Sequence, residues 1–260
     1  MFSQIVFRWA KENINLFIVM ERVAGTNTNS DNEGQKLSSK VDRRSFLMSA
    51  GIAASVGAAM VACTKDHEPT PGAGGSVDLG SGDVGVLNYA YALEQLEAAF
   101  YTQVIATPYD SISEAERTIL TDIRDHEIIH RDFFKAALTA AAPTAIIPAL
   151  EVDFSSINFK NRDSVLGAAK LFEDTGVAAY NGAGNLIKTA DYLVLAGKIV
   201  SVEARHASVI RDLLKQNTAD FAGDDVVDND GLDKAIDPAV ILAAVKPFLK
   251  TNVTGANVGK

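Results

Sequence analysis

The chain has 260 residues, 47% of them hydrophobic, and its 33 acidic and 24 basic residues give a formal net charge of −9. This length and apolar content suffice for one sizeable hydrophobic core. The acidic balance and the lack of a basic stripe argue against a nucleic-acid partner. A single cysteine, Cys63, excludes both a disulfide framework and a thiolate metal cluster.

Residues 1–62 have the pattern of an N-terminal extension with an export signal. The twin arginine Arg43–Arg44 precedes an apolar run over residues 50–62 that is too short to span a membrane. The run ends in small residues directly before Cys63, and the whole resembles a twin-arginine signal joined to a bacterial lipoprotein motif. We therefore expect lipidation of Cys63; the alternative is plain cleavage that leaves Cys63 free.

These signals predict an exported protein of the cell envelope or periplasm, held at a membrane through the lipid anchor only. Residues 63–82 are rich in Pro, Gly and Ser, which predicts a flexible tether. We assign residues 83–250 to one helical domain and residues 251–260 to a tail.

Four long helices with short turns and one long connection make up the predicted domain. Asp83 is the expected N-cap of the first helix, and Ser113 opens the second with a capping box. Pro143 and Pro148 interrupt the long connection, which we expect to pack along the helices. A further short helix near the C-terminus is expected to cap them. The predicted helices span residues 83–106, 113–142, 163–188 and 190–216.

Each helix has an apolar stripe at helical spacing that becomes charged in its middle. Two of the helices contribute a Glu-x-x-His pair, whose members lie on one helix face and can reach a common site. The residues at these positions are Glu94, Glu127, His130, Glu173, Glu203 and His206.

Four unpaired carboxylates cannot be buried together without a large cost in free energy, or without taking up protons. Two divalent cations would resolve this cost, and carboxylate and imidazole ligands suit iron or manganese, with zinc as a further candidate. The competing interpretation is that these residues form ion pairs on exposed helix faces, in which case the apolar stripes must point elsewhere.

An internal repeat supports the metal interpretation. Glu94 is followed seven residues later by Tyr101, and Glu173 is followed seven residues later by Tyr180. The repeat aligns Glu97 with Gly176, which favours Glu94 over Glu97 as the ligand from the first helix, with Glu97 as the runner-up.

We also expect supporting positions for the tyrosines of the repeat and for His126. Each tyrosine of the repeat is expected to hydrogen-bond a ligand carboxylate of the opposite half. His126 adjoins Glu127 but faces about 100° away on a helix, so we expect it at the surface or behind the ligands.

Two antiparallel hairpins joined by one long crossover predict an all-α, ferritin-like four-helix bundle. The motifs LNYAYALEQLEAAFY, HEIIH and VEARHASVI resemble the ferritin-like superfamily of di-iron carboxylate proteins. Within it, they are similar to the bacterial family of exported ferritin-like domains, some of them called desiccation-related. All six ligand positions match the pattern.

The resemblance implies binding of two iron or manganese ions and redox chemistry with oxygen or peroxide, such as iron oxidation or peroxide removal. It does not imply a storage cage, since a lipid-anchored chain with a long tether fits a closed shell poorly; a smaller oligomer stays open. The alternatives are a non-catalytic metal-binding or stress-protective protein, and an oxygenase for an organic substrate. An oxygenase needs a pocket beside the metals, for which Gly176 and the small residues Ala178, Ala179, Gly182 and Ala183 would leave room.

Overall fold

The computed structural model of the protein describes residues 75–260. Arg43–Arg44 and Cys63 lie outside these residues, so the export signal and the lipidation stay predictions. Among the described helices, none combines the length and the apolar character needed to cross a membrane.

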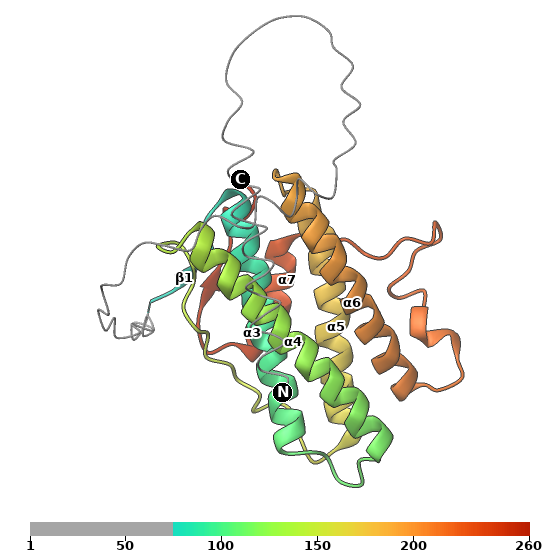
Figure 1. Ribbon diagram of the computed structural model, residues 1–260. Coiled ribbons are helices and arrows are strands. Elements are labelled where there is room, and N and C mark those ends of the chain that lie inside the picture. Colours follow the sequence, from blue (N-terminus) through green and yellow to red (C-terminus); the bar gives the residue numbers. More distant parts are fainter. Residues whose placement is uncertain (1–74) are drawn as a thin grey trace, which may run out of the picture. The chain divides into compact units, whose positions relative to one another are not determined.

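The described residues fold into the predicted four-helix bundle with a short C-terminal helix (Figure 1). α3 pairs with α4, and α5 pairs with α6, so each short turn joins two antiparallel neighbours. The long helices are α3 (Gly82–Ala106), α4 (Glu114–Ala141), α5 (Arg162–Gly184) and α6 (Ala190–Leu214). The smaller elements are β1 (Val77–Asp78), the 3₁₀ turns Ala219–Ala222 and Lys246–Phe248, α7 (Pro238–Val245) and β2 (Val253–Thr254).

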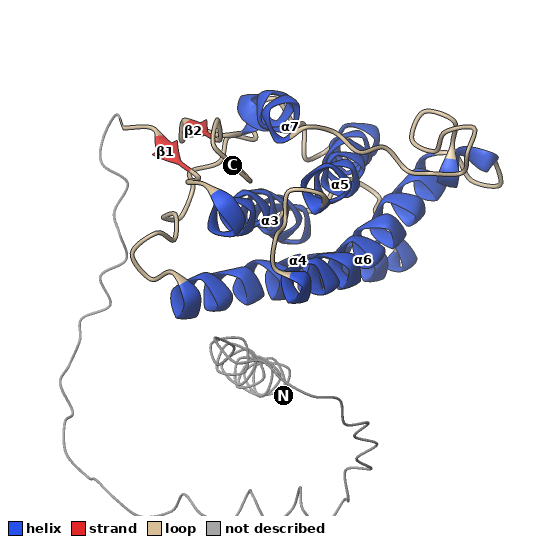
Figure 2. Cartoon of the chain, turned by 90° about the horizontal axis from the view of Figure 1, so that it is seen from above, coloured by secondary structure: helices blue, strands red, loops and turns tan. Residues whose placement is uncertain are grey.

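The helices differ in how much of their surface is buried, and the layers of the domain explain why. Figure 2 shows α3 and α5 between the pair α4 and α6 on one side and α7 with the two short strands on the other. α3 is accordingly buried on nearly every face, whereas α4 buries only one stripe, which runs from Leu120 to Leu138. A helix that is covered on all sides needs mostly apolar or small residues all round, as α3 has apart from its buried Asn88, Glu94, Gln95 and Glu97.

The start of α4 follows the sequence prediction, but the start of α3 does not. The Ser113 hydroxyl accepts a hydrogen bond from the Glu116 amide at 3.1 Å, which with the reciprocal Glu116 contact forms the capping box. α3 begins after Ser81, so the prediction of Asp83 as N-cap is wrong. The Asp83 carboxylate instead accepts hydrogen bonds from the amides of Lys188 and Thr189 at 2.7 and 2.9 Å.

α5 ends at Gly184, four residues before its predicted end. Residues 185–189 form the turn into α6, and the amides of a turn have no helical partner. Asp83 supplies the acceptor for two of them and so ties the first hairpin to the second.

The long connection between α4 and α5 packs along the bundle, as predicted. The Asn88 side-chain amide donates to the Ala145 carbonyl at 2.8 Å and accepts from the Ile147 amide at 3.2 Å. The Gln95 side chain accepts from the Leu150 amide at 2.8 Å. Two polar residues on buried α3 thus satisfy backbone groups that the prolines leave without helical partners.

Part of the segment that we assigned to the tether, and part of the assigned tail, pack against the domain. β1 and β2 pair in parallel through Val77–Val253 and Asp78–Thr254, and Leu79 is fully buried. Burial of Leu79 and the pairing of backbone groups give these segments a fixed place that their polar composition does not indicate.

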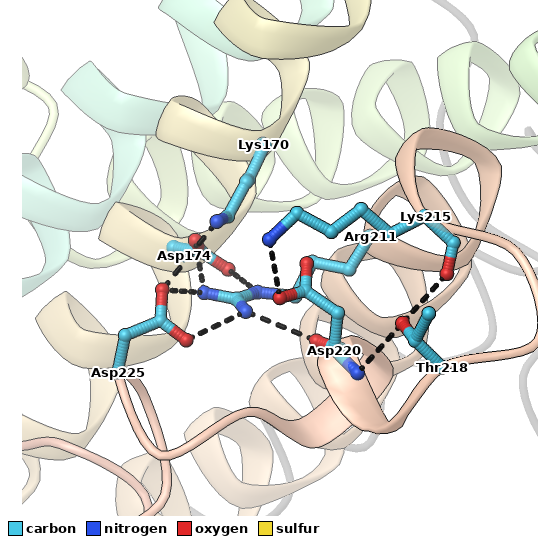
Figure 3. Close-up of polar contacts among 7 residues, drawn as sticks. All are labelled: Lys170, Asp174, Arg211, Lys215, Thr218, Asp220 and Asp225. Atoms are coloured by element: carbon cyan, nitrogen blue, oxygen red, sulfur yellow. Dashed lines mark hydrogen bonds and ion pairs between the residues drawn. The ribbon is translucent and has the colours of Figure 1, made fainter.

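A buried arginine anchors the long loop between α6 and α7 (Figure 3). Arg211 on α6 donates two hydrogen bonds at 2.8 Å to Asp174 on α5, and two more at 2.9 and 2.8 Å to Asp225 in the loop. It also donates to the Asp220 carbonyl at 3.0 Å. The planar guanidinium suits such paired contacts, and it holds the loop against both helices of the second hairpin.

Two glycines of α5 differ in their surroundings and so provide a test of the packing. A Cβ atom at Gly182 would lie 1.9 Å from the carbonyl oxygen of Ile236, whereas at Gly167 it would meet nothing within 4 Å. We expect Gly182→Ala to lower the free energy of unfolding by at least about 2 kcal/mol, because the backbone at Ile236 must move. Gly167→Ala should raise it by about 0.5–1 kcal/mol, the usual gain for alanine in a helix. Urea unfolding followed by circular dichroism measures both, and equal effects would contradict this packing.

Candidate metal centre

The four long helices bring all six predicted site residues together at one depth of the bundle. They form two groups whose nearest ligand atoms lie within 4.8 Å of one another. Glu127 and Glu203 belong to both groups, as two carboxylates between two ions would. The first group is Glu94, Glu127, His130 and Glu203, and the second is Glu127, Glu173, Glu203 and His206.

The cluster is closed to solvent except at the edges of its imidazoles. The side chains of the four glutamates are fully buried, whereas those of His130 and His206 are 11% and 5% exposed. The interpretation of these residues as exposed ion pairs is therefore excluded, because the charged middle of every stripe faces the core.

Each imidazole contacts its own helix and the other Glu-x-x-His helix. His130 Nδ1 lies 2.8 Å from a Glu203 oxygen and 3.6 Å from a Glu127 oxygen. His206 Nδ1 lies 2.8 Å from a Glu127 oxygen and 3.6 Å from a Glu203 oxygen. The two halves of the site therefore correspond to each other, with the roles of α4 and α6 exchanged.

The tyrosines complete this correspondence. The Tyr101 hydroxyl donates a hydrogen bond to Glu173 Oε1, and the Tyr180 hydroxyl donates one to Glu94 Oε1. Each tyrosine thus occupies one oxygen of a carboxylate from the other half. The second oxygen of that carboxylate is left to face the cluster.

The atoms that face the cluster test whether these residues fit metal ions. None of the following buried atoms has a hydrogen bond within residues 75–260: Glu94 Oε2, Glu127 Oε1 and Oε2, His130 Nδ1, Glu173 Oε2, Glu203 Oε1 and Oε2, and His206 Nδ1. Some pairs lie as close as 2.8 Å, yet their orientation does not make a hydrogen bond. Buried polar atoms normally have partners, so lone pairs that converge without one fit a set of metal ligands.

The pKa values of the carboxylates reflect the crowding of charge. Burial, followed by repulsion from Glu203, raises the pKa of Glu127 to about 8, and burial raises that of Glu173 to about 7 although His206 opposes the shift. Burial also disfavours ionisation of Glu203, but its contacts with both imidazoles outweigh burial and lower its pKa to about 2. Burial opposes protonation of His206, yet the surrounding carboxylates raise its pKa to about 12. Without metal, the cluster therefore retains protons that cations would displace.

Glu97, the alternative ligand from α3, belongs to neither group. It is buried one turn beyond Glu94, and a Cβ atom on Gly176 would lie 3.0 Å from its Oε1. Burial and the four neighbouring carboxylates raise the pKa of Glu97 well above its ordinary range.

The small residues of α5 do not open a space beside the cluster. The missing side chain at Gly176 leaves room for Glu97, and the backbone at Ile236 fills the space beside Gly182. Neither glycine leaves an open pocket of the kind an oxygenase would need.

The sequence did not indicate a partner for His126, although it predicted a position at the surface or behind the ligands. His126 is exposed on α4, and its Nδ1 lies 2.9 Å from Nε2 of His206 on α6. Helical geometry directs His126 away from Glu127, and only the neighbouring position of α6 brings it to His206. The one signal in the sequence was its place next to the Glu-x-x-His motif.

Comparison with known proteins agrees with this architecture. A family model described as a ferritin-like domain matches residues 82–216, which is more than half of the chain and includes all six cluster residues. A search of curated proteins returned no match. With the family match, the bundle topology and the buried carboxylate–histidine cluster in agreement, the chain belongs to the ferritin-like domain family.

Proposed function

We propose that the domain binds two iron or manganese ions and that the loaded centre reacts with oxygen or peroxide, as a ferroxidase or a peroxide-removing protein. The observation that carries the proposal is the convergence of eight buried oxygen and nitrogen atoms without hydrogen bonds. Such ions would supply redox equivalents and attract an oxygen-based oxidant.

The side chains around the cluster have roles that follow from their contacts. Glu127 and Glu203 would lie between the two ions, and His130 and His206 would each bind one. Tyr101 and Tyr180 hold the remaining carboxylates in orientation through their hydroxyls. Because orientation is fixed before an ion enters, little side-chain entropy is lost on binding.

A second function is favoured by the closure of the site: the ions would staple the bundle without turnover, in a protein that protects the envelope under stress. All four carboxylates are fully buried, which suits ions that stay in place. Oxidation of added Fe²⁺ distinguishes the two functions. Repeated oxygen-dependent oxidation supports the redox protein, and a bound but inert metal supports the staple.

We also propose that the protein is exported and lipid-anchored in the cell envelope, and that it belongs to the exported, desiccation-related type of ferritin-like domain. The support is the twin arginine, the short apolar run and Cys63, together with the motifs LNYAYALEQLEAAFY and HEIIH.

Metal stoichiometry tests the proposed centre. We expect about two Mn²⁺ ions per full chain in the wild type, consistent with two ligand groups. Glu127→Ala should lose both ions because it removes a shared ligand, whereas Glu173→Ala should keep about one because it removes a ligand of one group. Asp122→Ala, a change on the exposed face of α4, serves as the control and should keep both. Elemental analysis after gel filtration gives the counts, and a wild type without metal would refute the centre.

The stabilisation by metal should grow with pH. The folded pKa values of Glu127 and Glu173 lie above the ordinary value of 4.5, so their contribution to stability is lost as pH rises towards about 8. The folded pKa of His206 is also raised, so its contribution to stability likewise decreases as pH rises above its ordinary pKa of 6.5. Bound cations replace these protons, so the rise in melting temperature caused by Mn²⁺ should increase between pH of about 5.5 and about 8. Differential scanning calorimetry measures it, and a rise independent of pH would contradict proton displacement.

The anchor has its own test. Changing Cys63 to Ser removes the only thiol that could carry the lipid, so the protein should move from the membrane fraction to the soluble fraction of the envelope. Fractionation of bacterial cells that express the full chain shows its location. Retention of Cys63→Ser in the membrane fraction would argue against the lipid anchor.

A further inference from the structure

The contact between His126 and His206 has the geometry of an in-plane hydrogen bond. Their ring planes differ by 11°, their centroids are 5.2 Å apart, and Nδ1 of His126 lies 2.9 Å from Nε2 of His206. The centroid separation exceeds the separation of the two nitrogens by about the distances from these nitrogens to their own ring centres, so centroids and nitrogens lie nearly on one line. The rings therefore meet edge to edge, with the bond in their common plane.

The position of His206 decides which nitrogen donates. Its Nδ1 faces the cluster, 2.8 Å from Glu127 and 3.5 Å from Glu173. A nitrogen that binds a metal ion presents its lone pair, so the proton of neutral His206 resides on Nε2. Nε2 then donates to Nδ1 of His126. The acceptor thus selects the tautomer that the site needs and fixes the plane of the ligand ring.

The other half of the site lacks this support. The correspondence that aligns Glu127 with Glu203 and His130 with His206 aligns His126 with Val202. A valine side chain has no hydrogen-bond acceptor. Within residues 75–260, the polar contacts of His130 are made by its Nδ1, with Glu94, Glu127 and Glu203. The two imidazole ligands therefore differ in their outer contacts, although their contacts with the carboxylates correspond.

We propose that His126 is a positioning residue that makes the two metal positions unequal, so that the position with His206 binds its ion first and more tightly. The proposal deepens the proposed function and rests on it, because it requires that two ions bind. A hydrogen-bond acceptor behind a ligand imidazole increases the basicity of the ligand nitrogen and restricts rotation of the ring. Loss of such an outer partner typically weakens metal affinity by about 10–100-fold.

Calorimetric titration of the metal-free full chain with Mn²⁺ tests the proposal. We expect two separable binding steps in the wild type. His126→Leu removes the acceptor, so the tighter step should weaken by about 10-fold or more while the weaker step stays in place. His126→Asn keeps an acceptor oxygen at nearly the position of Nδ1 and should restore most of the affinity. Val202→Leu, at the corresponding position of the other half, should leave both steps unchanged.

The outcomes separate this proposal from the proposed function. Two steps that do not change in His126→Leu, or equal losses in His126→Leu and His126→Asn, would overturn the role of His126 and leave the dinuclear centre intact. Two indistinguishable steps in the wild type would overturn the inequality of the positions. A wild type that binds no Mn²⁺ would refute the proposed centre itself. Melting curves of the metal-free variants check that each one folds.

Discussion

The burial of four carboxylates in the middle of a helical bundle is the constraint on which the rest of the structure depends. Each one is removed from water, and each repels the others across short distances. A core of this kind is stable only if positive charge or protons accompany it. The imidazoles of His130 and His206 and the hydroxyls of two tyrosines are what the protein itself contributes.

The shortest of the compensating contacts run between elements, so the same interactions that neutralise the site also join the bundle. Both tyrosine hydroxyls cross from one hairpin to the other, and both imidazoles connect α4 with α6. Outside the cluster, Asp83 ties α3 to the turn before α6, and Arg211 ties α6 to α5 and the following loop. These anchors join α3, α5 and α6 to one another outside the cluster.

The pseudo-symmetry of the site is broken at two places, and both carry chemistry. Glu97 occupies space that Gly176 leaves, so one half has an additional buried carboxyl. His126 supports His206, whereas the corresponding Val202 cannot support His130. A site that arises from two similar halves can become directional through such differences, because its two ligand groups no longer have equal surroundings.

Much of this architecture was predictable from the residues alone. Apolar stripes at helical spacing, short turns and one proline-interrupted connection predicted the four helices and their order. The i, i+3 spacing of Glu and His predicted which faces meet, and the repeat with Tyr101 and Tyr180 favoured Glu94 over Glu97. Periodicity records which face of a helix is buried, and residues on the buried faces of four packed helices must converge.

Outside the cluster and its two tyrosines, only the tertiary structure decided which distant residues touch. Four contacts depend on how far one element is shifted along another. They are the hydrogen bonds from two amides to Asp83, the pairing of Val77 with the second strand, the approach of backbone to Gly182 and the bond between His126 and His206. That shift is set by side-chain packing across the whole domain, and the period of a single helix contains no record of it.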